Sequence, residues 1–287
     1  MTIITLPDEL DSPINYPIGL YDYRNFSNLL RGKIKLTRNT FSFLRAGTKE
    51  VFSENESVTI DKHAFLVLKS GNCLMTEIVS TEQQIYRSIL LFFTDEMLLN
   101  FLEKYKLPTS VTSDKTPSYL VCAYDGYIKN FTQSLEQIYR LDKALQNTLL
   151  PLKFEEIMTY LVQKEGVGFV SSILANRDDK VAKFVNVVEN NKLKKLTLQE
   201  LAFLCNMSLS SFKRAFVKQY DMSPIKWFQE KRLEHTAFLL STQKKRPKEL
   251  FASAGYETLS NFVQAFKKKF GVTPKQFQLA ANSKNMV

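Results

Sequence analysis

The stretch SLSSFKRAFVKQYDMSP (residues 208–224) returns as TLSNFVQAFKKKFGVTP (residues 258–274), fifty positions further along the chain. Ser208, which opens the first copy, can cap a helix, and the copies close on a Ser-Pro and a Thr-Pro pair. Two copies are too few for a solenoid, which needs about three or more repeats to bury a continuous core. The repeat therefore predicts two similar helical surfaces that act together.

Each copy predicts a helix with one apolar and one polar face, because its apolar residues recur three and four positions apart. The shared apolar positions are Leu209, Phe212, Ala215, Phe216 and Tyr220 in the first copy, and Leu259, Phe262, Ala265, Phe266 and Phe270 in the second. The opposite face differs between the copies: Ser210, Lys213, Arg214 and Val217 against Ser260, Val263, Gln264 and Lys267. We expect the shared face to pack and the variable face to carry the chemistry.

A short helix is predicted just before the first copy. In KLTLQELAFLCNMS (195–208), Thr197 and Glu200 have the spacing of a capping box, and Asn206 and Met207 precede the cap residue Ser208. A short helix, a tight turn and a capped second helix form a helix-turn-helix, whose second helix can enter the DNA major groove. Two such helices, at about 208–220 and 258–270, predict contact with two successive groove segments about 34 Å apart.

The variable faces offer side chains suited to reading bases. Arg214 and Lys213 can donate to guanine, Gln264 can pair with adenine, and Val217 or Val263 can contact a thymine methyl group. Because the two faces differ, we expect a nonpalindromic site. The predicted DNA-binding residues are Ser210, Lys213, Arg214, Val217, Lys218, Ser260, Asn261, Val263, Gln264, Lys267 and Lys268. Among the lysines near helix ends, the expected phosphate contacts are Lys218, Lys268, Lys269 and Lys275.

Residues 223–243, between the copies, predict a linker helix that sets the spacing of the two modules. Pro224 suits a first helical turn, and apolar residues follow at helical spacing. We expect Trp227 to be core and Arg232 to be an ion-pair or cap partner.

These C-terminal hundred residues resemble the double helix-turn-helix domain of the AraC/XylS family of bacterial transcription regulators. The resemblance rests on LTLQELAFLCNMSLSSFKRAFVKQYDMSPIKWFQEKRL (196–233) and on AGYETLSNFVQAFKKKFGVTPKQF (254–277), where a Gly-aromatic pair precedes an F-x-x-x-F helix that closes on G-x-T-P. It implies DNA-binding regulation of transcription, with RNA polymerase as a partner. The chain departs from the family pattern at four places: Leu250-Phe251 for Ile-Ala, Pro247 for an apolar residue, Tyr256 for Phe, and Thr236 for Ala.

Charge is concentrated in the same part of the chain. The 287 residues carry a formal net charge of +10, but residues 181–287 carry +12 and the first 180 residues carry −2. Such asymmetry predicts a polyanionic partner, either nucleic acid or an anionic membrane surface. A highly charged, solvated helical surface is the alternative.

The N-terminal part predicts a different class of structure. Runs rich in β-branched and aromatic residues between Phe41 and Phe93 predict a β meander or small barrel. Helical spacing follows at 95–105, at about 126–145 and at about 151–164, and the boundary is expected within 165–180. The apolar stripes of these helices would be core or a dimer face. This part resembles, more loosely, the cupin-like regulatory domain and dimerisation helices of the family. Within the family, segments such as GTKEVF (47–52) and AFLVLKSGN (64–72) are most similar to members related to the type III secretion activator ExsA.

The expected fold class is therefore α+β. A cupin-like β-barrel with dimerisation helices would occupy residues 1–170, and an all-α domain with two helix-turn-helix modules joined by a linker helix would occupy residues 181–287. No signal peptide is expected at the N-terminus, and no apolar run approaches the roughly 20 residues of a membrane span, so we expect a cytoplasmic protein without membrane contact.

Metal and enzyme chemistry are not expected. The chain has two histidines, His63 and His235, and its three cysteines are widely spaced, so no zinc site or Ser-His-Asp or Cys-His grouping can be assembled, and no cofactor is predicted. An anionic effector could bind a set of cations in the N-terminal part, or these could be solvated surface side chains: Lys33, Lys35, Arg38, Arg45 and Lys49. The effector site is therefore unknown.

The sequence predicts a DNA-binding transcription regulator, most simply an activator, that binds promoter DNA and is controlled through its N-terminal domain by a small effector or a regulatory protein. A homodimer through the N-terminal helices is possible. The alternative is a non-catalytic interaction protein whose basic helices bind an acidic partner or an anionic membrane.

Overall fold

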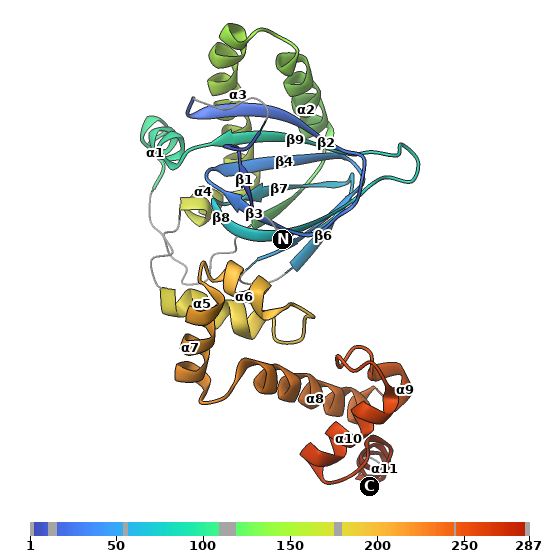
Figure 1. The fold of residues 1–287 in the computed structure, drawn as a ribbon. Helices are drawn as coiled ribbons and strands as arrows, with labels where there is room; N and C mark the ends of the chain where they lie inside the picture. The colour runs from blue at the N-terminus through green and yellow to red at the C-terminus, as the bar shows by residue number, and fades with distance from the viewer. Residues whose placement is uncertain are drawn as a thin grey trace. The chain divides into compact units, whose positions relative to one another are not determined.

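The computed structural model describes residues 3–10, 16–53, 57–108, 119–174, 180–243 and 245–284. The chain forms two compact units (Figure 1). The N-terminal unit contains Met1–Val187 and Phe203–Asn206, and the C-terminal unit contains Val188–Ala202 and Met207–Val287. Part of the predicted boundary stretch, residues 175–179, lies outside the described residues.

Two five-stranded sheets form the N-terminal unit. The first has the order β1-β3-β8-β5-β6, built from Ile3–Leu6, Leu29–Leu36, Gly71–Ile78, Thr48–Phe52 and Ser57–Ile60. The second has the order β10-β7-β4-β9-β2, built from Tyr119–Ala123, Ala64–Leu68, Asn39–Ala46, Tyr86–Phe93 and Ile18–Asn25. All neighbours pair antiparallel except β1 and β3, which pair parallel.

The predicted small barrel is corrected in two respects. The described strands form two separate sheets rather than one closed barrel, and they begin at Ile3, well before Phe41. Strand β2 was missed because its polar residues, including Asp22 and Arg24, interrupt the apolar alternation, and its pairing partner β9 lies far along the chain. The broader prediction, an N-terminal β-sheet unit and a C-terminal helical unit, is confirmed.

Strand β9 explains how the sheets are layered. Its residues Leu90 and Phe92 are in the apolar core between the two sheets, whereas Ile89, Leu91 and Phe93 are in the core between the second sheet and the helices. Side chains alternate across a strand, so a strand buried on both faces needs an uninterrupted apolar run. The sequence ILLFF is therefore the centre of a three-layer unit.

The described helices that lie wholly within the N-terminal unit are α1 (Asp95–Lys104), α2 (Gly126–Tyr139), α3 (Lys143–Glu165) and α4 (Gly168–Leu174), and the unit also includes the first part of the next helix. Helices α2 and α3 lie together beside β2 and β9, as Figure 1 shows. The apolar stripes of α2 and α3 supply Phe131, Leu135, Phe154, Ile157 and other residues to the core against the sheet. Burial in the core thus accounts for these residues, and the dimer face stays a prediction.

The break between α2 and α3 falls at residues 140–142, whereas the sequence predicted it at about 146–150, directly before Pro151. Asp142 caps α3, because its Oδ1 accepts from Leu145 N at 2.9 Å. Gln146 Nε2 donates to the carbonyl oxygens of Tyr139 and Leu141, which satisfies the end of α2. Pro151 lies inside α3. Capping rather than the proline therefore decides the boundary.

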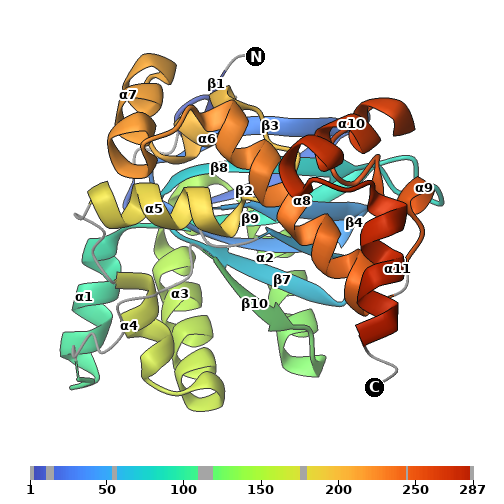
Figure 2. The same cartoon turned by 90° about the horizontal axis from the view of Figure 1, so that it is seen from below.

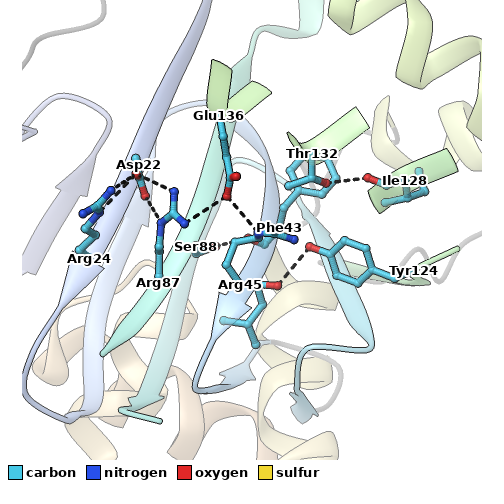
Figure 3. A network of polar contacts seen from close by, with 11 residues as sticks. Asp22, Arg24, Phe43, Arg45, Arg87, Ser88, Tyr124, Ile128, Thr132 and Glu136 are labelled. Atoms are coloured by element: carbon cyan, nitrogen blue, oxygen red, sulfur yellow. Dashed lines mark hydrogen bonds and ion pairs between the residues drawn. The ribbon is translucent and has the colours of Figure 1, made fainter. Parts of the chain in front are cut away.

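An ion-pair network fastens α2 to the second sheet (Figure 3). Glu136 of α2 accepts from Arg45 Nε at 3.0 Å and lies 3.2 Å from Arg87 Nη1. Arg87 also donates to both carboxylate oxygens of Asp22, and Arg24 donates to Asp22 as well. Burial alone would raise the pKa of Asp22, but the hydrogen bonds from the two arginines outweigh it and hold that pKa below its ordinary value.

The helices that follow in the described residues are α5 (Lys180–Asn190), α6 (Leu198–Leu204), α7 (Leu209–Tyr220), α8 (Pro224–Thr242), α9 (Pro247–Leu250), α10 (Leu259–Phe270) and α11 (Pro274–Lys284). The bounds of α7, α8 and α10 confirm the predicted recognition and linker helices to within two residues. Across the described ranges, no helix is long and apolar enough to cross a bilayer, and no group of three or more potential metal ligands occurs.

Candidate nucleic-acid interface

The first helix-turn-helix is built from local hydrogen bonds. Thr197 N donates to Glu200 Oε2 at 2.6 Å and Glu200 N donates to Thr197 Oγ1 at 3.2 Å, which is the predicted capping box. Asn206 takes a left-handed conformation (φ 56°) that ends α6. Ser208 Oγ then accepts from Ser211 N at 3.2 Å and starts α7. The chain turns within four residues because each helix end is satisfied.

The buried face of α7 packs onto the start of the linker helix α8. Phe212 and Phe216 are fully buried, and Phe216 contacts Tyr220, Trp227 and Phe228 through ring pairs at 4.7 to 5.7 Å between centroids. Trp227 is thus core, as predicted. The outward face carries Ser210, Lys213, Arg214, Val217 and Lys218, all of them exposed. This face presents three cations, one hydroxyl group and one small apolar group to solvent.

The second module repeats the design with a different turn. Thr258 Oγ1 accepts from Asn261 N at 3.2 Å, and Phe262 and Phe266 are fully buried. The left-handed residue that precedes the cap is Gly255 (φ 89°), which is one position earlier than Asn206 in the fifty-residue alignment of the copies. The second turn therefore contains one more residue before its helix.

Most of the predicted contact residues on α10 are exposed, namely Ser260, Asn261, Gln264, Lys267 and Lys268. Val263 differs from them, because its side chain is half-buried and packs against the core of the second module. Leu259, predicted to be buried, is 40% exposed. The exposed face of α10 therefore includes Leu259, and Val263 lies at its edge, partly covered by the module core.

Two cations predicted for this region have other surroundings. Lys269, an expected phosphate contact, lies 3.4 Å from Glu230 and 3.0 Å from Glu234 of α8. Arg232, expected to be an ion-pair or cap partner, makes no ion pair among the described residues; its Nε is buried without a hydrogen bond, and burial lowers its pKa. Neither placement could be found from sequence, because both depend on how α8 packs against the second module.

The four departures from the family pattern are accommodated in the second module. Thr236 is buried and its hydroxyl donates to the Arg232 carbonyl oxygen at 2.8 Å. Tyr256 uses its hydroxyl to accept from Gln229 Nε2 at 2.9 Å. Pro247 takes the first position of α9, where its missing N–H costs nothing, and Phe251 is half-buried against the module core.

The linker helix sets the geometry of the two modules. It has 19 residues, so its length is about 28 Å at a rise of about 1.5 Å per residue. Figures 1 and 2 show α7 beside the start of α8 and α9 to α11 around its end. The length of α8 is comparable with one turn of B-DNA, about 34 Å. One rigid helix thus joins two exposed, chemically different helix faces.

The N-terminal unit contains a small cavity between its sheets. Leu36, Val51, Leu68, Tyr119 and Lys69 line it, and its volume is about 120 Å³. Pockets for drug-sized ligands are typically about 300 to 1,000 Å³. The cavity as it stands therefore has room for a very small molecule.

Two of the cations considered for an anionic effector are engaged inside the protein. Lys49 is 2% exposed, lies 3.6 Å from Glu77 and donates to Ser42 Oγ at 3.1 Å. Arg45 is paired with Glu136. Lys69 and Lys183, which were not among the predicted cations, line the cavity. Lys69 follows the buried strand β7, a position that has no motif by which it could be predicted.

Comparison with known proteins gives two domain matches. Residues 39–172 match the ExsA N-terminal regulatory domain, and residues 201–280 match a helix-turn-helix domain. The chain is 31% identical over 137 residues to the virulence regulon transcriptional activator VirF of Yersinia enterocolitica, a match that covers 46% of this chain and 49% of VirF. The chain thus spans about half the length of this relative.

Two further similarities cover more of the chain. The regulator ExsA of Pseudomonas aeruginosa is 22% identical over 234 residues, which are 79% of this chain and 84% of ExsA. Among solved structures, apo ToxT from Vibrio cholerae is 13% identical with a TM-score of 0.43, and the alignment covers 92% of this chain and 98% of ToxT.

Proposed function

Because the chain belongs to the AraC/XylS family of transcription regulators, we propose that it binds promoter DNA in a sequence-specific way through α7 and α10. The observation that carries the proposal is the pair of capped helices at the two ends of α8. Each helix buries two phenylalanines and exposes a polar face whose side chains differ from those of the other helix. Matched packing with unlike outer faces suits one chain that reads two different base sequences.

The roles of individual side chains follow from their chemistry. Arg214 and Gln264 occupy the same position in the two copies and carry the groups best suited to guanine and adenine. Lys213, Lys267, Ser210, Ser260 and Asn261 would extend the same faces. Lys218, Lys268 and Lys275 are exposed near helix ends, where contact with phosphate is expected. The net charge of +12 on residues 181–287 would supply the attraction common to all sequences.

Control through the N-terminal unit is part of the proposal. The relative VirF is a transcriptional activator by name, and we propose activation, with RNA polymerase as a further partner, for this chain. The cavity of about 120 Å³ favours a regulatory protein or a very small effector over a large ligand. We also propose that the β unit has a regulatory role like that of cupin-like domains and that the chain dimerises through α2 and α3. It would act in the cytoplasm and regulate without catalysing a reaction.

The test is selection of binding sites from a random duplex pool by the full chain, followed by gel-shift titration and footprinting. We expect a selected site with two protected segments about one helical turn apart on the same face of the duplex. Equal affinity for the selected duplex and its scrambled version at moderate ionic strength would contradict the proposal. Binding to anionic vesicles in place of DNA would favour the membrane alternative.

A further inference from the structure

The contacts between the linker helix and the second module are unlike those of the first module. In the first module, the contacts of α7 with α8 are mainly aromatic, through Phe216, Tyr220, Trp227 and Phe228. In the second module, Leu233 and Leu240 of α8 share an apolar core with Phe262 and Phe266 of α10. Polar and charged side chains of α8 also contact residues at both ends of α10. These contacts, here called the α8 attachment, join Gln229 to Tyr256, Arg232 to Gly255, and Glu230 and Glu234 to Lys269.

The first part of the α8 attachment lies just before α10. Gln229 Nε2 donates to the Tyr256 hydroxyl at 2.9 Å, and the guanidinium of Arg232 is close to Gly255. A Cβ atom at Gly255 would lie 3.3 Å from Arg232 Nε, and the φ of 89° at Gly255 is a conformation that favours glycine. The turn that leads into α10 is therefore tightly fitted to α8.

The second part lies at the end of α10. Lys269 Nζ donates to Glu234 Oε1 at 3.0 Å and to Glu230 Oε2 at 3.4 Å, and its side chain is 19% exposed. Burial alone would raise the pKa of Glu234, but hydrogen bonds from Lys269 and Lys231 outweigh it and lower that pKa. In the aligned position of the first copy, Gln219 is exposed. The lysine is thus a feature of the second copy alone.

Attachment at two points constrains direction as well as distance. Tyr256 lies three positions before Leu259, where α10 begins, and Lys269 is the last residue but one of α10. A contact at one end of a helix leaves it free to swing about that end, whereas contacts at both ends set its angle. The direction of α10 relative to α8 is therefore determined by side chains of α8.

We propose that the α8 attachment positions the second recognition helix, so that Lys269, Glu230, Glu234, Gln229 and Tyr256 decide which spacing between the two half-sites the protein accepts. This inference rests on the proposed function. One base pair inserted between half-sites moves the second by about 3.4 Å and rotates it by about 35°. A firmly held α10 cannot follow that displacement, while a loosened one can. The attachment residues act through α10 and need not touch DNA.

The experiment uses the full chain and the duplex selected from a random pool, with versions that have one base pair added or removed between the two footprinted segments. The quantity measured is the ratio of affinity for the native spacing to affinity for the altered spacing. A change in net charge shifts affinity for all duplexes together, because it acts on the phosphates, so it cancels in this ratio. The variants are Lys269→Glu, the exchange Glu234→Lys with Lys269→Glu, and Tyr256→Phe.

We expect wild type to lose about tenfold or more on either altered duplex, which is comparable with the cost of a mismatched base pair. Lys269→Glu should reduce that discrimination severalfold, since it sets a third carboxylate beside Glu230 and Glu234, and the charge exchange should restore it. Tyr256→Phe removes only a hydroxyl, keeps the ring, and should reduce discrimination in the same direction even if Lys269→Glu does not fold.

Three results would count against the α8 attachment. A wild-type protein that reads its selected sequence but tolerates altered spacing would overturn the inference and leave the proposed function intact. So would Lys269→Glu and Tyr256→Phe variants that keep the wild-type ratio. A wild-type protein that prefers no sequence would remove the proposed function itself and this inference with it.

Discussion

Arg214 and Gln264 show how one position in a repeated helix can be given different chemistry. Both are exposed and follow a fully buried phenylalanine by two residues, Phe212 and Phe262 respectively. The backbone of each copy is held by the same caps and the same buried ring pair, so the side chain at this position can change without cost to the fold. Recognition can therefore diverge between copies while packing is kept.

At the residue scale, Arg214→Ala should cost roughly 1 to 3 kcal/mol on the selected site and relax preference at one base position. The physical reason is that a bidentate contact to guanine distinguishes that base from the other three. Lys268→Ala is the control, because loss of a phosphate contact should weaken all sequences alike. Gel-shift titration on selected and randomised duplexes measures both. Equal losses of Arg214→Ala on the two duplexes would remove it as a base reader.

Asp22 gives a second prediction at the residue scale, for the N-terminal unit. Its pKa is held below the ordinary value of about 3.9 by Arg87 and Arg24. The stabilisation is thus fully present above that value and is lost as the pH falls through the lowered pKa.

The variant Asp22→Asn should lower the midpoint of thermal unfolding at pH 7 and do so progressively less as the pH falls below about 4. Thermal unfolding followed by circular dichroism over this pH range measures the difference. A difference that grows in acid would show that the carboxylate does not stabilise the folded state.

At the scale of the element, each helix of the second module depends on a small aromatic core. Phe266 of α10 is fully buried and lies within 4.5 to 5.7 Å, between ring centroids, of Phe262, Phe270 and Phe277. Its other core neighbours, including Leu233, Leu240 and Leu250, are close-packed and can fill only part of a cavity at this position. Helix α10 should therefore be sensitive to truncation at this position.

We expect Phe266→Ala to destabilise the C-terminal unit by about 3 to 5 kcal/mol, through lost burial and the cavity left behind. Val217→Ala, on the exposed face of α7, is a control for stability and should change it by less than about 0.5 kcal/mol. Denaturant unfolding of the full chain measures both. Comparable losses in the free energy of unfolding for the two variants would mean that the aromatic core does not stabilise the module.

At the scale of the whole molecule, the excess positive charge lies on residues 181–287 and the N-terminal part is nearly neutral. If Lys218, Lys268 and Lys275 each neutralise one phosphate, log K should fall with log salt concentration with a slope of about −2.7 or steeper, at about −0.9 per contact. Gel-shift titration at several salt concentrations measures the slope. A value near zero would mean that phosphate contacts do not drive binding.

Long-range packing limited how much of the molecule could be predicted. Strand β2 pairs with β9 and Asp22 meets Arg87 from 65 positions away, so neither the strand nor its ion pair has a local signature. Helix α3 was predicted to begin at Pro151, because proline usually breaks a helix. The hydrogen bonds of Asp142 and Gln146 place the boundary earlier in the chain. The neighbours of Val263, Lys269 and Arg232 could not be predicted for the same reason, since they come from the module core, from α8 or from the turn before α10.

The sequence by itself determined the two helix-turn-helix modules, their caps, their buried phenylalanines and the bounds of α7, α8 and α10, because these depend on hydrogen bonds and side-chain spacing within a few residues. Only the tertiary structure decided that the strands form two sheets under a layer of helices, and that α8 holds both ends of α10 through Tyr256 and Lys269. Such contacts join residues tens of positions apart, and their energy exists only once the chain has brought them together.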